Sequence, residues 1–437
     1  MSTWTYNGTV PGPLIRARRG DTLEITVRNQ LPEHTTVHWH GLALRNDMDG
    51  IHHVTQAPIE TGQEFVYRFA LGQTGTYWYH SHIGLQADRG MYAPLVIDDP
   101  STDRTVDGEH VIVLDDWLDG IGGATPADAM QQLHCDGSCT SPPGPTGTTV
   151  GPTGTGPSMI GRFHSPLLGG DAGSIDYPLH LLNGQPATAP PTFDAAPGSR
   201  VRLRVINAGA ETAYRFAVGG HRLTVTHADG YPVEPVDVDA LLLGMGERYD
   251  VEIVAKSGAW PIVANAEGKR GGATGVLRTT DTNIATTAPP TRDAAPSELD
   301  GKLLTYDQLR AIEAVRLDFT QPDQSHEVGL TGRNADYHWG IDGGEYPNNG
   351  AIDVRLDERA RIAVRNTTKM WHPMHLHGHS FRLGERADGP RKDTAIVKPG
   401  ELLTFDTVCD NPGQWMVHCH NAYHLEMGMA KAFGYVR

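Results

Sequence analysis

Short segments in which hydrophobic and polar residues alternate recur along the whole chain. Residues 22–27 read Thr-Leu-Glu-Ile-Thr-Val, and residues 201–205 read Val-Arg-Leu-Arg-Val. This period of two buries one face of a β-strand, and the 51 glycines and 30 prolines supply turns between such strands. We therefore expect an all-β protein built from sandwiches or barrels.

The alternating pattern belongs to a unit that occurs three times. Strand-like segments that end in asparagine lie at residues 20–29, 198–207 and 357–366. A second shared segment, which begins with glycine, aligns without gaps at residues 75–82, 258–265 and 413–420. A proline near residue 100 and a linker near residue 285 give the expected domain boundaries. The three predicted domains are residues 1–100, 101–285 and 286–437.

Histidines occur in pairs separated by one residue. A chain with 22 histidines has four such pairs: His38 and His40, His80 and His82, His375 and His377, and His418 and His420. Residues two apart on a strand share a face, so both rings of a pair point the same way. Packed imidazoles repel one another when charged, and each buried ring nitrogen needs a partner. The pattern therefore favours metal binding over core packing.

One cysteine lies between the histidines of the last pair. Cys419, His424 and a second imidazole, with Met429 as a weak axial ligand, make the ligand set of an electron-transfer copper site. Neighbouring side chains on a strand point to opposite faces, so His418 and His420 face away from that site. The thiolate would then be connected through a few covalent bonds to a second metal site, which suits electron transfer.

The three units keep different residues at these positions. The middle unit has Val263 and Asn265 where the other two have histidine, so we expect it to be structural. In the first unit, Thr35, Ser81 and Gln86 replace the histidine and cysteine ligands of the third, so it cannot hold the thiolate site. We expect the four histidine pairs to meet between the first and third domains.

Composition narrows the remaining possibilities. The formal net charge of −16 argues against nucleic acid as a partner, and no apolar run is long enough to span a membrane. The numbering starts almost on a strand, so we expect that an export leader has been removed and that the protein is extracellular, periplasmic or in the cell envelope. Cys135 and Cys139 share a Gly/Pro-rich loop as a disulfide or a soft-metal pair, and Cys409 is expected to be a buried small hydrophobe.

The motifs together resemble those of the three-domain multicopper oxidases, the laccase-like family, over nearly the whole chain. The resemblance rests on His-Trp-His-Gly, His-Ser-His, His-Pro-Met-His-Leu-His-Gly-His and His-Cys-His-x3-His-x4-Met, at residues 38–41, 80–82, 372–379 and 418–429. It implies three cupredoxin-like Greek-key β-barrel domains and four coppers, one of type 1, one of type 2 and two of type 3. The implied type 1 ligands are His372, Cys419, His424 and Met429. The implied type 2 ligands are His38 and His375, and the implied type 3 ligands are His40, His80, His82, His377, His418 and His420.

The resemblance also implies an activity. It predicts an oxidase that couples one-electron oxidation of phenols or aromatic amines to the four-electron reduction of dioxygen to water. Asp49 and Glu426 are the expected proton-relay acids, although each is otherwise an ordinary solvated or salt-bridged carboxylate. The expected partners are dioxygen and a small reducing substrate. We expect neither nucleic acid nor a membrane, and a monomer.

Three other functions stay open on the sequence. A metal oxidase acting on cuprous or ferrous ion would use the same chemistry, with Cys135 and Cys139 as a soft cuprous site. A copper nitrite reductase would pair a blue copper with a second site, but it would not need four histidine pairs. A copper-binding carrier would hold metal without consuming oxygen, and it would not need the connection through Cys419.

Overall fold

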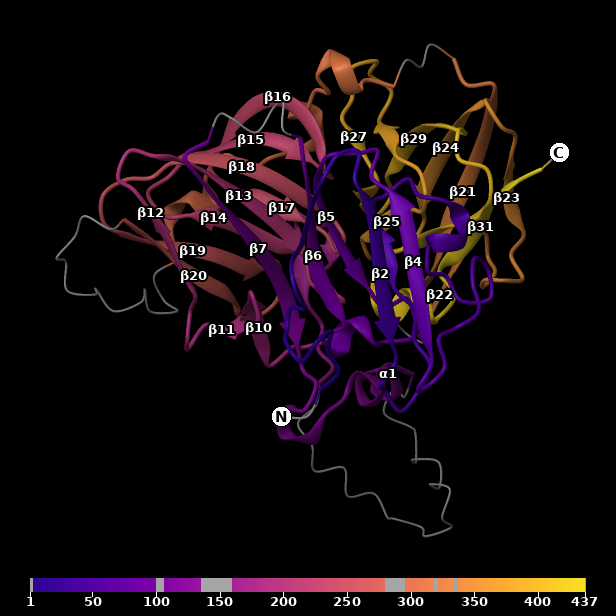
Figure 1. The fold of residues 1–437 in the computed structure, drawn as a ribbon, viewed down its shortest axis with the longest axis horizontal. Helices are drawn as coiled ribbons and strands as arrows, with labels where there is room; N and C mark the ends of the chain where they lie inside the picture. The colour runs from indigo at the N-terminus through magenta and orange to yellow at the C-terminus, as the bar shows by residue number, and fades with distance from the viewer. Residues whose placement is uncertain are drawn as a thin grey trace, which may run out of the picture.

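Strands dominate the structure. The computed structural model describes residues 3–99, 106–134, 159–279, 295–317, 321–333 and 337–436. Strands account for 48% of the structure and helices for 9%, so the all-β prediction is confirmed. Figure 1 shows the indigo N-terminal strands against the orange and yellow C-terminal strands, with the magenta middle unit alongside. Both predicted domain boundaries, near residues 100 and 285, fall outside the described residues.

The first unit has a four-stranded and a two-stranded sheet. The four-stranded sheet has the order β1 (Ile15–Arg18), β6 (Tyr92–Asp98), β5 (Gly75–His80) and β3 (His38–His40). The other sheet pairs β2 (Thr22–Arg28) with β4 (Glu64–Ala70). Trp39, Phe69 and Leu95 come from the two sheets and pack in one hydrophobic cluster, so the sheets share a core.

The middle unit is a sandwich of seven and five strands. The seven-stranded sheet has the order β11 (Gln185–Pro186), β10 (Leu179–Leu182), β7 (Gly108–Trp117), β13 (Arg200–Asn207), β18 (Arg248–Val254), β15 (Leu223–Ala228) and β16 (Tyr231–Val238). The five-stranded sheet has the order β12 (Thr192–Ala195), β20 (Gly272–Thr279), β19 (Ala259–Ala266), β14 (Tyr214–Val218) and β17 (Leu241–Leu243). A short pair, β8 (His164–Ser165) and β9 (Gly170–Asp171), lies outside both sheets.

The third unit is a sandwich of six and five strands. The six-stranded sheet has the order β22 (His338–Ile341), β21 (Gln324–Arg333), β24 (Arg359–Asn366), β29 (Leu402–Val408), β26 (Phe381–Leu383) and β27 (Arg391–Lys392). The five-stranded sheet has the order β23 (Ala351–Val354), β31 (Ala430–Tyr435), β30 (Gln414–Cys419), β25 (His372–Leu376) and β28 (Thr394–Val397).

All three units repeat one topology. In each, a short strand pairs in parallel with the last strand of the unit: β1 with β6, β12 with β20, and β23 with β31. The alternating strand that follows pairs antiparallel with a later one: β2 with β4, β13 with β18, and β24 with β29. The sequence repeat is therefore a repeat of structure.

The equivalent hairpins explain where histidines can meet. His38 is opposite His80 in the first unit, and His375 is opposite His418 in the third. In the middle unit the matching pair is Ala217 opposite Val263. Both of these residues are buried in a small aliphatic cluster, as expected for a unit that presents no imidazole there.

Helices are few in the described part of the chain. Its α-helices are α1 (Pro126–His134) and α2 (Ala422–Glu426), and the other helical segments are short 3-10 turns such as Asn46–Met48. Asn421 caps α2 by accepting hydrogen bonds from the backbone of Tyr423 and His424. No helix in the described part of the chain is both long and apolar enough to cross a membrane. The Gly/Pro-rich loop with Cys135 and Cys139 lies outside the described residues.

Candidate metal centre

Eight buried histidines from the first and third units converge on one place. The strands β3, β5, β25 and β30 carry or immediately precede all of them. Rings from different units approach closely: the centroids of His40 and His375 are 3.8 Å apart, and those of His38 and His377 are 4.0 Å apart. The members of this eight-histidine centre are His38, His40, His80, His82, His375, His377, His418 and His420.

Most of these rings have one nitrogen that is buried without a hydrogen-bond partner. The unpartnered atoms are Nε2 of His38, His80, His82, His375 and His420, and Nδ1 of His40. A buried polar atom without a partner carries the full cost of its desolvation, and so many together are rare in native proteins. These atoms fit a set of metal ligands, because a bound cation would accept their lone pairs.

The opposite nitrogens show which atom carries the proton. Nδ1 of five rings lies 2.8–2.9 Å from an oxygen: His38 on the Asp49 carbonyl, His80 on the Ser81 carbonyl, His375 on the Asp393 carbonyl, His377 on the Asp49 carboxylate, and His418 on the Cys419 carbonyl. Each Nδ1–H donates to that oxygen, which leaves a lone pair on Nε2. Nε2 of His377 and Nε2 of His418 then face each other at 2.9 Å as two acceptors, an arrangement that a cation between them would stabilise.

Electrostatics keep this centre neutral. Burial, followed by repulsion from neighbouring imidazoles, lowers the pKa of seven of the rings below the ordinary value of 6.5. For His375, the carboxylate of Asp393 partly opposes the effect of burial. Neutral imidazole is the form that binds metal, so burial prepares these side chains as ligands.

A second cluster lies in the third unit. Sγ of Cys419 is 3.5 Å from Nδ1 of His424 and 3.6 Å from Nδ1 of His372, and these two nitrogens are 3.1 Å apart. Burial raises the pKa of the Cys419 thiol, so a metal ion would have to displace its proton. One thiolate and two imidazoles in a triangle suit copper.

Met429 and an aromatic wall complete the surroundings of this cysteine site. Met429 is fully buried, its N–H donates to the carbonyl of His424, and its carbonyl accepts from the N–H of Cys419. Trp339 stacks on His424 with centroids 4.3 Å apart, and Tyr337 lies 5.9 Å away. Nε2 of His424 is buried and has no hydrogen-bond partner.

The first unit has a polar trio at the equivalent place. Thr35, Ser81 and Gln86, the counterparts of His372, Cys419 and His424, are all buried. The hydroxyls of Thr35 and Ser81 each donate to Oε1 of Gln86 at 2.7 Å. Their polar atoms satisfy one another, so this position differs from the metal-ligand pattern of the third unit.

The two predicted acids occupy different surroundings. Asp49 is fully buried, and its Oδ2 accepts from Nδ1 of His377 while its backbone carbonyl accepts from His38. Glu426 instead lines a cavity of about 460 Å³, and His82 and His418 also line this cavity. Burial raises the pKa of Glu426, which favours its protonated form. Asp49 therefore contacts two rings of the histidine centre, whereas Glu426 faces the space next to them.

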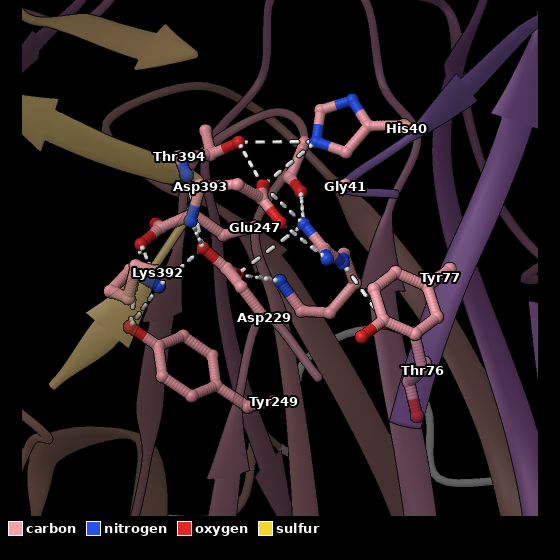
Figure 2. Close-up of polar contacts among 12 residues, drawn as sticks. His40, Gly41, Thr76, Tyr77, Asp229, Glu247, Tyr249, Lys392, Asp393 and Thr394 are labelled. Atoms are coloured by element: carbon pink, nitrogen blue, oxygen red, sulfur yellow. Dashed lines mark hydrogen bonds and ion pairs between the residues drawn. The ribbon is translucent and has the colours of Figure 1, made fainter. Parts of the chain in front are cut away.

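Several residues around the centre had no signal in the sequence. Asp88 lines the same cavity, accepts a hydrogen bond from the Tyr423 hydroxyl at 2.5 Å, and has a pKa raised by burial. Asp393 contacts His40, and Arg248 of the middle unit contacts Asp393 (Figure 2). Cys409 is buried, as expected for a small hydrophobe.

Comparisons with known proteins agree with this geometry. Sequence models of the multicopper oxidase family match residues 1–102, 163–286 and 319–436. The multicopper oxidase MmcO of Mycobacterium tuberculosis is 46% identical over 100% of this chain and 84% of its own length. A copper resistance protein A homologue of Pseudomonas syringae pv. tomato is 30% identical over 97% of this chain and 87% of its own. The solved laccase of Botrytis aclada superposes with a TM-score of 0.77 at 27% identity, covering 99% of this chain and 83% of its own.

The neutral histidines predict how the metal-free protein responds to pH. Burial lowers the pKa of His372 to about 3, from an ordinary value of 6.5. Below pH ~6.5 the unfolded chain therefore binds protons that the folded chain excludes, so the free energy of unfolding should fall as the pH is lowered towards 5. Thermal melting of metal-free protein across this range measures the effect. His372→Gln should make the pH dependence less steep without abolishing it, because the other buried rings still contribute, whereas His53→Gln, at an exposed position, should leave it unchanged. Melting of the unaltered protein that does not change with pH would contradict the prediction.

Proposed function

Because the chain belongs to the multicopper oxidases, which are copper-dependent oxidoreductases that use oxygen, we propose that electrons enter at the cysteine site and reach dioxygen at the eight-histidine centre. The expected fold of three cupredoxin-like β-barrels is confirmed by the solved relatives, which match across the whole chain. The observation that carries the proposal is the convergence of unpartnered ring nitrogens from two barrels.

We propose the following ligand sets. The type 1 copper takes His372, Cys419, His424 and axial Met429. The type 2 copper takes His38 and His375. One type 3 copper takes His82, His377 and His418, whose ligand atoms lie within 4.8 Å of one another. The other takes His40, His80 and His420, whose ring centroids lie 4.9–5.8 Å apart.

The residues present fit these sets. Copper bound there supplies one-electron redox chemistry at the cysteine site and a place to collect electrons for dioxygen at the histidine centre. The chain itself supplies the connection, because Cys419 lies between His418 and His420 in one covalent segment. Met374, directly opposite Cys419 on β25, and His375, opposite His418, keep the two sites in a fixed register.

Protons and oxygen share the cavity on one side of the histidine centre. The cavity of about 460 Å³ is lined by His80, His82, His418, His420, Glu426 and Asp88, among others. Burial raises the pKa of both acids, which favours the protonated form of each close to the place where oxygen reduction would consume protons. We propose that Glu426 delivers protons there and that Asp49 orients His377.

The surroundings of the cysteine site favour an aromatic donor. Trp339 and Tyr337 lie against His424, and Leu133 of α1 belongs to the same hydrophobic cluster. A donor cation would need an acidic side chain to bind it. Glu211 is not available for this, because it already pairs with Lys269 at 2.6 Å and accepts hydrogen bonds from two backbone amides. Trp339, Tyr337 and His424 are themselves buried, so the proposal rests on the apolar, aromatic character of these surroundings, which suits a phenol or an aromatic amine better than a hydrated metal ion.

A metal oxidase remains the second candidate. The specific observation in its favour is the identity of 30% to a protein named for copper resistance. Its predicted soft site, Cys135 and Cys139, lies outside the described residues. The family match does not favour a nitrite reductase or a copper carrier. The expected monomer and the location outside the cytoplasm stay predictions.

Replacing the thiolate tests the proposed type 1 site. We expect Cys419→Ser to lose the intense thiolate-to-copper absorption and donor oxidation, because a hydroxyl is a poor copper ligand. The near-ultraviolet shoulder of the paired coppers should persist, since no ligand of that pair is altered. Metal analysis and absorption spectra measure both. The matched control is Cys409→Ser, also buried in the third unit, which should keep the blue colour. A blue Cys419→Ser protein would contradict the assignment.

The stoichiometry of oxygen uptake tests the reaction. An oxygen electrode with a substituted phenol should show about four donor molecules oxidised per dioxygen, without accumulation of hydrogen peroxide. Parallel turnover of cuprous ion separates the two donor classes. A Cys135→Ser, Cys139→Ser double variant should be slower with cuprous ion alone if that loop binds the metal. Faster turnover of cuprous ion than of every phenol tried would exclude the aromatic-donor proposal.

Glu426 should determine how the oxygen-reducing step depends on pH. A protonated carboxyl can donate only below its pKa, so the rate should fall as the pH rises through the raised pKa of Glu426. Glu426→Gln should be at least about 10-fold slower below that pKa and should lose the pH dependence. Copper content and both absorption bands should be unchanged. Glu385→Gln, an exposed acid of the same unit, is the control. An unaltered pH profile in Glu426→Gln would remove Glu426 from the proton path.

A further inference from the structure

His40 differs from the other rings of the histidine centre in which nitrogen is free. Where a free nitrogen is found on the other rings, it is Nε2, but in His40 it is Nδ1. Nε2 of His40 lies 3.2 Å from Oδ1 of Asp393 and 3.1 Å from the hydroxyl of Thr394. Asp393 and Thr394 of the third unit therefore contact Nε2 of this first-unit ring, and its free nitrogen is Nδ1.

Asp393 and Thr394 form an acceptor site made for an N–H group. The Thr394 hydroxyl donates its own proton to Oδ1 of Asp393 at 2.8 Å, so its lone pairs are left to accept. Nδ1 of His375 also lies 2.9 Å from the carbonyl of Asp393 and 3.1 Å from the same hydroxyl. One dipeptide at the start of β28 thus orients His40 and His375, which stack on each other.

The guanidinium group of Arg248, from the middle unit, binds the carboxylate of Asp393 through two hydrogen bonds. Its Nη1 donates to Oδ1 of Asp393 at 2.6 Å and its Nη2 donates to Oδ2 at 2.7 Å (Figure 2). Both side chains are fully buried. Oδ1 also accepts a hydrogen bond from the Thr394 hydroxyl at 2.8 Å, so both oxygens of the carboxylate already face donors. A carboxylate held in this way accepts hydrogen bonds and does not donate to His40.

The middle unit also holds the backbone of the same dipeptide. Oδ2 of Asp229 accepts hydrogen bonds from the N–H groups of Asp393 and Thr394, both at 3.1 Å. Lys392, the preceding residue, lies 3.1 Å from Asp229 and 3.1 Å from Glu247, so the charges alternate across the interface between the two units. Figure 2 shows these groups on one side of His40.

Gly41 leaves the space that the ion pair between Arg248 and Asp393 occupies. Gly41, directly after His40, has a φ of +86°, and a Cβ there would lie 2.5 Å from Nη2 of Arg248 and 2.6 Å from Oδ2 of Asp393. Three units therefore meet at one ion pair: Gly41 from the first, Arg248 from the middle and Asp393 from the third.

We infer that Asp393, clamped by Arg248, is a positioning residue that fixes the proton of His40 on Nε2 and so makes Nδ1 the copper-binding atom. The inference rests on the proposed function, because it needs a copper pair at the histidine centre. The middle unit supplies no ligand, yet through Arg248 it decides which atom of a ligand in another unit is available.

The experiment compares the copper-loaded full-length protein with Asp393→Asn. An amide has one acceptor oxygen and one NH2 group, so Arg248 loses one of its two acceptors in either orientation of the side chain. In the orientation that places the NH2 group at Oδ1, that group also donates to Nε2 and drives the proton of His40 onto Nδ1. We expect about 10- to 100-fold weaker copper binding at the type 3 pair and loss of the near-ultraviolet shoulder. The thiolate-to-copper absorption should persist, since no type 1 ligand contacts Asp393.

Asp406→Asn is the matched control. Asp406 is a fully buried carboxylate of the same unit, and Arg361 donates two hydrogen bonds to it, at 2.7 and 2.8 Å. Among its described contacts there is no proposed ligand histidine. The Asp406→Asn substitution should lower the melting temperature without changing either absorption band. An equal loss of the near-ultraviolet shoulder in Asp406→Asn would show that folding alone is responsible and would overturn the inference.

Arg248→Lys tests the clamp if Asp393→Asn folds poorly. Lysine cannot hold a carboxylate with two parallel hydrogen bonds, so we expect a smaller loss of the same shoulder. Because Arg248 acts through Asp393, the double variant should lose no more than Asp393→Asn alone. A full shoulder in both single variants, or additive losses, would overturn the inference. If the unaltered protein shows no paired-copper absorption after loading, the proposed function fails first and the inference with it.

Discussion

The structure depends on the unpartnered nitrogens of buried, neutral imidazoles. Water is excluded from them, and protein groups occupy the opposite nitrogen of most of these rings, so the free lone pairs have few ways to be satisfied other than by cations. This constraint requires two barrels to close against each other, because neither has enough imidazoles alone. Rings of the first and third units, such as His40 and His375 with centroids 3.8 Å apart, are in direct stacking contact where the two barrels meet.

The three copies of one topology have taken different roles by small changes at equivalent positions. Val263 in the middle unit, opposite Ala217, makes an aliphatic core where its counterparts carry ligands. Ser81 in the first unit shares hydrogen bonds with Thr35 and Gln86 where the third unit has a thiolate and two imidazoles. In each case the replacement satisfies its own polar atoms or has none, which explains how the equivalent position can be buried without metal.

The sequence predicted the parts of the site that strand periodicity controls. Residues i and i+2 share a face, so the histidine pairs and the divided surroundings of Cys419 could be inferred without coordinates, as could the replacements in the other units. Asp393 and Arg248 could not be inferred, because they are 145 residues apart in sequence and meet only when two barrels dock. Asp88 was missed for the same reason, since Tyr423, its partner, is 335 residues away. Short-range spacing therefore identifies the histidines and the cysteine that converge, whereas the groups that contact them from other units depend on how the units dock.

The acids around the histidine centre can be sorted by what they touch. Asp49 and Asp393 contact ligand rings, and for Asp393 the attraction of Arg248 lowers the pKa, so it remains an acceptor. Glu426 and Asp88 line the cavity, and burial raises the pKa of each, which favours their protonated forms. An acid that must hold a tautomer has to stay ionised, and an acid that must deliver protons has to be protonated first. The pairing of Asp393 with Arg248, and the absence of a cation among the contacts described for Glu426 and Asp88, therefore fit the proposal that Asp393 orients a ring and that Glu426 supplies protons.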